Sequence, residues 1–308
     1  MEILDLVGNT PLVKIYEDKN ILLKIEGANL FGSIKDRAAV YIIERGIEDG
    51  FINRDTEVIE SSSGNFAIAL AGICNIKDIK FSCVIDPLIS QVNKRILEIY
   101  KANIIIADVC DSNGSYVRER IRIVNSVLEN NSNFYWPNQY DNPIICEAYE
   151  KTIGTEIAQI KDLDYVFVAV STCGTIAGIS KALKHLKPNV KVIAVDIEGS
   201  KIFQNKGSKK YINGMGASFT PANLEHAIID DVIMINTDEC ISGCARLLEK
   251  GIFAGGSSGA VFAACLKYSR QHKLEEKVLL CVLPDRGERY IDTIYNNQWK
   301  RRIGLWKD

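Results

Sequence analysis

Four short loops rich in glycine and hydroxyl residues carry most of the chemistry that this sequence supports. The first places Lys35 one turn into an expected helix, just after the small pair Gly32 and Ser33. A lysine amine in such a place is a candidate nucleophile or general base when its surroundings lower its pKa. The plain alternative is that Lys35 and Arg37 are two solvated charges on a helix, and this loop taken alone favours that alternative.

Two further loops join the end of a strand to the start of a helix. Residues 61–65 (SSSGN) follow the run EVIE and open a very apolar helix, so their hydroxyls and amides suit a carboxylate. Residues 171–175 (STCGT) follow the run YVFVAV and have the character of a phosphate cradle, although they match neither a Walker loop nor a dinucleotide fingerprint. From spacing alone, an ordinary capped turn explains residues 171–175 equally well.

The fourth loop, residues 255–259 (GGSSG), opens the run AVFAACL and lets the backbone approach a flat ligand closely. One of its serines is free to hydrogen-bond a ring nitrogen. The turn at residues 283–289 (LPDRGER) ends the run VLLCVL and would line the same region, unless its charges are simply solvated. Ligands of α/β sheets bind at the carboxyl ends of the strands, so these loops are expected to face one site.

Alternating strand and helix patterns must position these loops. Short β-branched runs alternate with amphipathic helical segments, a rhythm that predicts parallel sheets covered by helices. Some helices are expected to start at caps such as Ser33 and Thr237. The expected strands are residues 57–60, 81–85, 103–107, 165–170, 190–195 and 278–283, and the expected helices are residues 35–49, 65–76, 89–101, 115–129, 175–186, 237–250 and 259–270.

Length and charge limit the class of protein. A chain of 308 residues suits two lobes that share a cleft, with a boundary near residue 145. The formal net charge is -2 and no block of like charges occurs, so we expect no nucleic-acid or membrane partner. The first residues show no signal-like pattern and no segment reaches ~20 apolar residues, so we expect a cytoplasmic protein that acts on small molecules.

Other reaction classes have little support in the sequence. The nine cysteines are scattered through apolar segments, and packing explains Cys240 and Cys244 better than a shared metal does. With three histidines, no HExxH motif and no elbow-type serine, zinc-protease and Ser-His-Asp chemistry are disfavoured. A nicotinamide-dependent oxidoreductase is disfavoured because the G-x-G-x-x-G turn and its acidic partner are missing.

Jointly and in this order, the loops resemble the cysteine synthase and cystathionine β-synthase family of fold-type II pyridoxal phosphate (PLP) enzymes. The resemblance covers nearly the whole chain through GNTPL, GSIKDR, SSSGN, NQY, STCGT, GMGASF, GIFAGGSSGA and LPDRGERY. It implies an α/β fold like that of tryptophan synthase β, with two parallel-sheet-containing domains and the active site in the cleft between them. The smaller, mobile domain would be residues 40–145, and the larger, cofactor-binding domain residues 1–39 plus 146–308.

The resemblance also implies a cofactor, PLP, and a role for each loop. Lys35 would form the Schiff base with PLP and then act as the general base. Asn65 would contact the phenolic oxygen of PLP, and Ser257 would face its pyridine nitrogen. The residues expected to hold the cofactor phosphate are Ser171, Thr172, Cys173, Gly174 and Thr175. The residues expected to bind the substrate carboxylate are Ser62, Ser63, Asn65 and Gln139.

The implied reaction is β-replacement on an activated L-serine through an α-aminoacrylate intermediate. Within the family, the sequence looks most like the branch that makes N-(2-amino-2-carboxyethyl)-L-glutamate from O-phosphoserine and glutamate. That branch leads toward 2,3-diaminopropionate in siderophore biosynthesis of the staphyloferrin B type. A phosphate leaving group and an acidic nucleophile call for cationic or hydrogen-bonding groups, for which Arg120, Tyr140 and Ser218 are candidates. A surface position on its helix explains Arg120 equally well.

Several alternatives stay open. A cysteine synthase that uses O-acetylserine and sulfide, or a cysteine lyase that releases hydrogen sulfide, would need the same cofactor. A catalytically idle relative is disfavoured because the lysine and the loops are all retained. The sequence departs from the family at Leu30, at Phe66, which would narrow or dry the carboxylate pocket, and at Cys173 in the phosphate loop. Relatives are usually homodimers, and we expect the same here.

Overall fold

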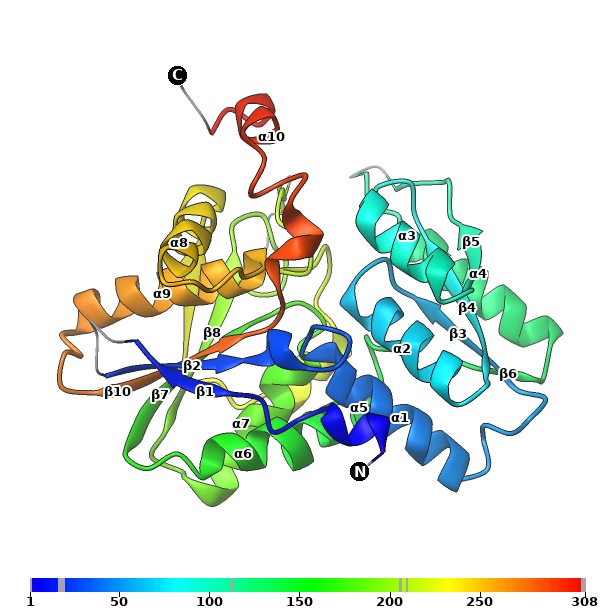
Figure 1. Cartoon of the computed structure of the whole chain (residues 1–308), viewed down its shortest axis with the longest axis horizontal. Helices are drawn as coiled ribbons and strands as arrows, with labels where there is room; N and C mark the ends of the chain where they lie inside the picture. Colours follow the sequence, from blue (N-terminus) through cyan, green and yellow to red (C-terminus); the bar gives the residue numbers. More distant parts are fainter. Residues whose placement is uncertain (1, 16–19, 112–113, 205–206, 209, 306–308) are drawn as a thin grey trace.

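The computed structural model describes residues 2–15, 20–111, 114–204, 207–208 and 210–305. It contains two β-sheets, each flanked by helices, and the α/β class predicted from the sequence is confirmed (Figure 1). In the part of the chain that is described, no helix is both long enough and apolar enough to cross a bilayer.

The larger sheet has the strand order β1-β2-β10-β7-β8-β9. Its neighbours pair in parallel except at the edge, where β1 runs antiparallel to β2. This antiparallel edge strand was not among the strands expected from the sequence. The connection between β1 and β2 spans only residues 15–20, and a parallel crossover needs a dozen residues or more. The strands are β1 (Leu12–Lys14), β2 (Ile21–Ile25), β7 (Leu163–Ala169), β8 (Lys191–Ile197), β9 (Asp231–Ile235) and β10 (Val278–Leu283).

The smaller sheet has the order β5-β4-β3-β6, and its strands are all parallel. Its strands fall between residues 57 and 135, whereas those of the larger sheet lie outside this range. The division into domains 40–145 and 1–39 plus 146–308, and the mobility of the smaller domain, stay predictions. The strands are β3 (Glu57–Ser61), β4 (Lys80–Ile85), β5 (Asn103–Ile106) and β6 (Phe134–Tyr135).

Helices cover both sheets, and two of them touch backbone to backbone. A Cβ atom on Gly243 would lie 2.0 Å from the carbonyl oxygen of Gly259, so α8 and α9 pack closely only because both positions are glycine. The helices are α1 (Lys35–Glu48), α2 (Asn65–Ile76), α3 (Gln91–Ile99), α4 (Val117–Asn130), α5 (Pro143–Tyr149), α6 (Thr155–Ala158), α7 (Gly174–Leu186), α8 (Thr237–Glu249), α9 (Gly256–His272) and α10 (Asn297–Arg302). Shorter turns are η1 (Ile3–Leu6), η2 (Glu26–Ala28), the π-helical η3 (Glu150–Gly154), η4 (Ala222–His226) and η5 (Gly287–Tyr290).

The helix caps differ in detail from the prediction. Asn236, not Thr237, caps α8. Its side chain accepts from the backbone N–H of Glu239 at 2.9 Å, and the Glu239 carboxylate accepts from the backbone N–H of Asn236. The predicted cap was therefore one residue too late. The hydroxyl of Ser33 does accept from the backbone N–H of Lys35 at 3.2 Å, although the helix itself begins after Ile34.

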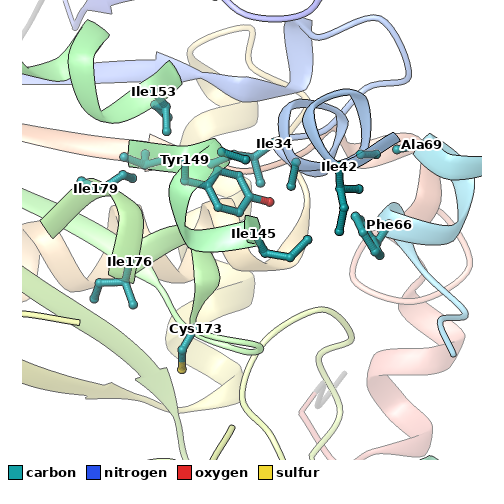
Figure 2. Close-up of a cluster of buried hydrophobic side chains, with 14 of the residues drawn as sticks. Ile34, Ile42, Phe66, Ala69, Ile145, Tyr149, Ile153, Cys173, Ile176 and Ile179 are labelled. Atoms are coloured by element: carbon teal, nitrogen blue, oxygen red, sulfur yellow. The ribbon is translucent and has the colours of Figure 1, made fainter. Parts of the chain in front are cut away.

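The largest apolar cluster joins the two halves of the molecule. It brings together side chains from helices on both sheets, and Figure 2 shows Ile42 of α1, Phe66 of α2, Tyr149 of α5 and Ile176 of α7. All four are buried. Helices α1, α2 and α7, which start at three of the candidate loops, therefore share one core, which fixes those loops relative to one another, whereas the apolar side chains of α9 lie in a second cluster.

Candidate active site

Lys35 is the first residue of α1 and lies partly buried against the end of β10. The backbone N–H of Ile34 donates to the carbonyl of Pro284 at 2.8 Å, and Ser33 forms a β-bridge with Asp285. Burial lowers the pKa of the Lys35 amine to about 8, and the nearby Asp285 carboxylate opposes that shift. An amine with such a pKa is suited to act as nucleophile or base near neutral pH.

The charges that follow Lys35 are not solvated, so the alternative of an ordinary surface helix was wrong. The Arg37 guanidinium is buried and pairs with Glu26 at 2.7 Å and with Glu156 at 2.6 Å. Lys24 adds a second cation 2.7 Å from Glu156. This network ties the first turn of α1, which carries Lys35, to β2 and α6.

Residues 171–175 form a sharp turn between β7 and α7. Cys173 takes the left-handed conformation, with φ of 62°, and the helix starts at the next residue. The first backbone N–H groups of a helix have no intrahelical acceptor, so this turn offers donors to an anion. A Cβ on Gly174 would lie 2.6 Å from the Ile145 side chain, so only glycine lets the turn lie this close to α5. The turn therefore fits the phosphate of PLP.

A buried polar cluster lies where α2, α9 and the end of β10 meet. Oδ2 of Asp285 accepts from Asn65 Nδ2 at 2.7 Å and from the Tyr290 hydroxyl at 2.7 Å, and Ser257 faces the same carboxylate. Burial raises the pKa of Asp285. The other oxygen, Oδ1, is buried and has no hydrogen-bond partner among the residues described. Together with Lys35 of α1, these groups offer a polar aromatic ring hydrogen-bonding partners from α1, α2, α9 and the segment after β10.

The sequence analysis assigned no individual role to any residue of the turn at 283–289. The structure places two of these residues in contact with the candidate site. Asp285 is buried in the polar cluster, and Arg289 donates to the side chain of Asn65 and to the carbonyl of Phe31. The alternative of simply solvated charges was wrong for both. The only available signal was their position after the buried run VLLCVL, since a strand end in an α/β sheet faces the site.

The candidate carboxylate pocket lies at the end of β3. Gln139 donates through Nε2 to the carbonyl of Ser61 at 3.2 Å, and Asn93 donates to the carbonyl of Ser63 at 3.1 Å. Ser62 and Gln139 are both buried. The structure thus brings residues predicted to bind the substrate carboxylate to one place, at the start of α2.

Arg120 lies against this pocket and not on the surface. It is 6% exposed, and its Nη1 lies 3.3 Å from the Ser63 hydroxyl and 3.3 Å from the Asp86 carboxylate. Tyr140 hydrogen-bonds Arg120, while burial raises the pKa of the Tyr140 phenol. The surface alternative for Arg120 was therefore wrong, and the predicted neighbours Arg120, Ser63 and Tyr140 are together.

Ser218 approaches the same region from the side of the larger sheet. Its hydroxyl lies 3.3 Å from the hydroxyl of Ser115, and the ring of the next residue, Phe219, lies 5.5 Å from the Tyr140 ring. No contact of Ser218 with Arg120 itself is found within the described residues. Ser218 therefore borders the group formed by Arg120 and Tyr140.

The departures from the family pattern have different surroundings. Phe66 is buried and packs into the apolar cluster, where it fills the core beneath the start of α2 (Figure 2). Leu30 packs partly buried against the same cluster. The Cys173 thiol contacts the carbonyl of Ser171 at 3.6 Å, within its own loop. Cys240 and Cys244 are buried, and their thiols donate to the carbonyls at the start of α9.

Comparison with known proteins identifies the class. A family model described as pyridoxal-phosphate dependent enzyme matches residues 3–285, so the chain belongs to this family. The predicted cofactor, the enzyme class and the fold-type II architecture are confirmed.

Three solved structures are similar over nearly their whole length. An O-acetylserine-dependent cystathionine beta-synthase from Helicobacter pylori is 31% identical, with 96% of this chain and 99% of that chain covered and a TM-score of 0.88. A hydrogen sulfide-producing enzyme from Fusobacterium nucleatum is 30% identical, with 94% and 97% covered and a TM-score of 0.87. An O-ureido-L-serine synthase is 29% identical, with 96% and 95% covered and a TM-score of 0.89. The chain is a PLP-dependent enzyme of the cysteine synthase type.

Proposed function

We propose that this enzyme catalyses β-replacement on O-phospho-L-serine, with the amine of glutamate as nucleophile and N-(2-amino-2-carboxyethyl)-L-glutamate as product. That product would serve 2,3-diaminopropionate formation in siderophore biosynthesis, as in the branch that the sequence resembles. The observation that carries the proposal is the buried Arg120 beside Ser63 and Tyr140. A guanidinium at the carboxylate pocket suits a substrate with a second, phosphate anion.

In this proposal each loop has one task. Lys35 would hold PLP, and residues 171–175 would bind its phosphate, while Asn65 and Ser257 would contact the ring. PLP supplies an electron sink for the negative charge that develops on the substrate. Lys35, once released, would take the proton from the α-carbon and later return it.

The remaining groups would bind the substrate and its leaving group. Ser62, Ser63, Asn65 and Gln139 would orient the carboxylate, because their polar groups lie at the end of β3 and the start of α2. Arg120 and Tyr140, bordered by Ser218, would stabilise the phosphate as its bond to the β-carbon breaks.

A competition assay tests the proposed substrates. The PLP-loaded enzyme is given O-phospho-L-serine with equal concentrations of glutamate and sulfide, and the new amino acid is identified by mass spectrometry. The glutamate adduct is the expected product. Cysteine alone would contradict glutamate as the nucleophile.

Arg120→Ala tests the donor. Its kcat/KM for O-phosphoserine is expected to fall about 100-fold, because a buried charge contact is lost, and its kcat/KM for O-acetylserine less than about 10-fold. Arg122→Ala, on the exposed face of the same helix, is the matched control and should change neither value. Equal losses on both donors would contradict a phosphate contact at Arg120.

A second candidate is a cysteine synthase or a hydrogen sulfide-releasing cysteine lyase. It is favoured by the similarity to structures described as a hydrogen sulfide-producing enzyme and an O-acetylserine-dependent cystathionine beta-synthase. The same cofactor and the same lysine would serve it. Product identity in the competition assay separates the two candidates.

We also propose a cytoplasmic homodimer in which the smaller domain, residues 40–145, closes on the substrate. Eight of the nine cysteines are buried free thiols, which suits a reducing compartment. Light scattering after size-exclusion chromatography measures the oligomeric state, and a mass of one chain would contradict the dimer. Small-angle scattering with and without substrate tests the closure.

A further inference from the structure

Glu60 is a fully buried carboxylate at the end of β3, with 0% of its surface exposed. Its Oε1 accepts from the backbone N–H of Ser61 at 2.8 Å and from Trp136 Nε1 at 3.2 Å, and the backbone of Gln139 also hydrogen-bonds it. Oε2 is buried and has no partner among the residues described. One carboxylate therefore joins the two chain segments that form the candidate carboxylate pocket.

Among the residues that the structure describes, no cation forms an ion pair with Glu60. Arg120 is the cation that acts on it, but the ion pair formed by Arg120 within the described residues is with Asp86, at 3.3 Å. Burial, opposed by the hydrogen bonds and by Arg120, raises the pKa of Glu60 to about 7. The other titratable groups that face Glu60 are Cys83 of β4, Tyr135 of β6 and Tyr140.

We propose that Glu60 is a positioning residue of the substrate pocket and that its charge sets how strongly the pocket binds an anionic donor. Its carboxylate holds Ser61 and Gln139 in place, directly behind the groups that receive the substrate carboxylate. When Glu60 is ionised, its negative charge opposes an incoming anion, and a bound anion in turn opposes its ionisation. The identity of that donor as O-phosphoserine rests on the proposed function.

The sign of the pH effect follows from the direction of ionisation. Glu60 is neutral below about pH 7 and negative above it, so the affinity for an anionic donor falls as pH rises. The phosphate of the donor also ionises, near pH 6, but it does so equally with every variant of the enzyme. The isosteric variant Glu60→Gln, which stays neutral, therefore isolates the contribution of Glu60.

Steady-state kinetics of the holoenzyme test this dependence. The KM for O-phosphoserine of the wild type, divided by that of Glu60→Gln, is expected to rise about fivefold between pH 6 and pH 8.5. The corresponding kcat ratio should stay within about twofold, because Glu60 touches the pocket and not the reacting atoms. A constant KM ratio would overturn the proposal.

Tryptophan fluorescence gives a readout that does not depend on turnover. Trp136 donates to Glu60, so its emission should change with a midpoint near pH 7 in the wild-type holoenzyme. The transition should be absent in Glu60→Gln and in Trp136→Phe. A transition that persists unchanged in Glu60→Gln would overturn the assignment.

A second variant and a second donor keep the proposal testable if Glu60→Gln does not fold or if O-phosphoserine is not the donor. If Glu60→Gln does not fold, Trp136→Phe keeps the carboxylate but removes a hydrogen bond that lowers its pKa, so the KM transition should move to higher pH. An unmoved transition would overturn the proposal. If the enzyme accepts only O-acetylserine, the proposed donor fails, while the fluorescence transition and a smaller KM dependence for that donor remain expected.

Discussion

Replacing Arg37 by methionine is expected to destabilise the protein strongly, although Arg37 touches no candidate substrate group. Its side chain is 1% exposed, and its guanidinium makes contacts of 2.7 and 2.9 Å to Glu26 and of 2.6 and 3.0 Å to Glu156. After the change, the partners that Glu26 keeps among the described residues are neutral, Thr10 at 2.5 Å and Asn29 at 2.8 Å. An uncompensated buried carboxylate costs about 3–5 kcal/mol.

Urea unfolding followed by circular dichroism measures this cost. The matched control is Arg122→Met, because Arg122 is 67% exposed and its 2.7 Å pair with Glu119 lies on the surface of α4. An exposed pair contributes about 0–1 kcal/mol. Equal free-energy losses for the two variants would refute the argument that burial makes the Arg37 pair important.

The same network predicts how stability depends on pH. Although burial opposes it, the Arg37 guanidinium lowers the pKa of Glu156 from 4.5 to about 2. A carboxyl with a depressed folded-state pKa stabilises the protein above its unfolded value and loses that contribution as pH falls through the folded value. The wild type should therefore lose stability between about pH 4.5 and pH 2, and Arg37→Met should lose less over that range. An identical acid limb in both proteins would contradict this reasoning.

Three further predictions concern the site and the packing. Lys35→Ala should keep the circular dichroism of the wild type but lose turnover and the visible absorption of bound PLP; normal turnover would contradict the role of Lys35. Asp285→Asn should move the pKa of the Lys35 amine below about 8, because a negative charge that raises this pKa is removed. Reductive methylation of the cofactor-free protein across pH measures this pKa, and an unchanged or higher value in the variant would contradict the prediction. Gly178→Ala places a Cβ 2.4 Å from the carbonyl oxygen of Cys146 and should destabilise by about 1–3 kcal/mol, whereas Gly64→Ala, with open space around its Cβ, should stay within about 0.5 kcal/mol in thermal unfolding.

Segments with a strong local pattern could be predicted from the sequence. The central strand β10 was predicted at residues 278–283, where the structure has it, because a strand buried on both faces reads as one continuous apolar run. β9, Asp231–Ile235, was missed because it lies at the edge of the sheet, where buried and less buried residues alternate. Five residues are too few for this alternation to stand out in the sequence. α5, Pro143–Tyr149, was missed because seven residues form barely two helical turns.

The candidate loops could also be predicted, because each has a strong local sequence pattern. The burial and the partners of individual charged residues could not. Residues 61–65 and 171–175 each carry their own signal, a strand end followed by small polar residues and a helix. The burial of Arg37 depends on Glu156, 119 residues away, and the contact of Asn65 with Asp285 spans 220 residues. No local pattern distinguishes such a charge from a solvated one, so Arg37 was judged wrongly from its immediate neighbours.

Glu60 and Glu156 show why these distant partners decide function as well as stability. Both are glutamates in or beside buried networks, yet a contacting arginine lowers the pKa of Glu156 to about 2, whereas Glu60, without one, has a pKa of about 7. Glu156 therefore keeps its charge at neutral pH, where it pairs with Arg37 and Lys24. The charge of Glu60 changes within the physiological range, directly behind Ser61 and Gln139. A carboxyl whose folded-state pKa is raised stabilises the protein most below its unfolded value and loses that contribution as pH rises. Glu60 should therefore contribute less to the stability of the fold as pH rises from about 4.5 to about 7, and its ionisation should weaken anion binding as pH rises through about 7, so one carboxyl links the substrate pocket to the stability of β3.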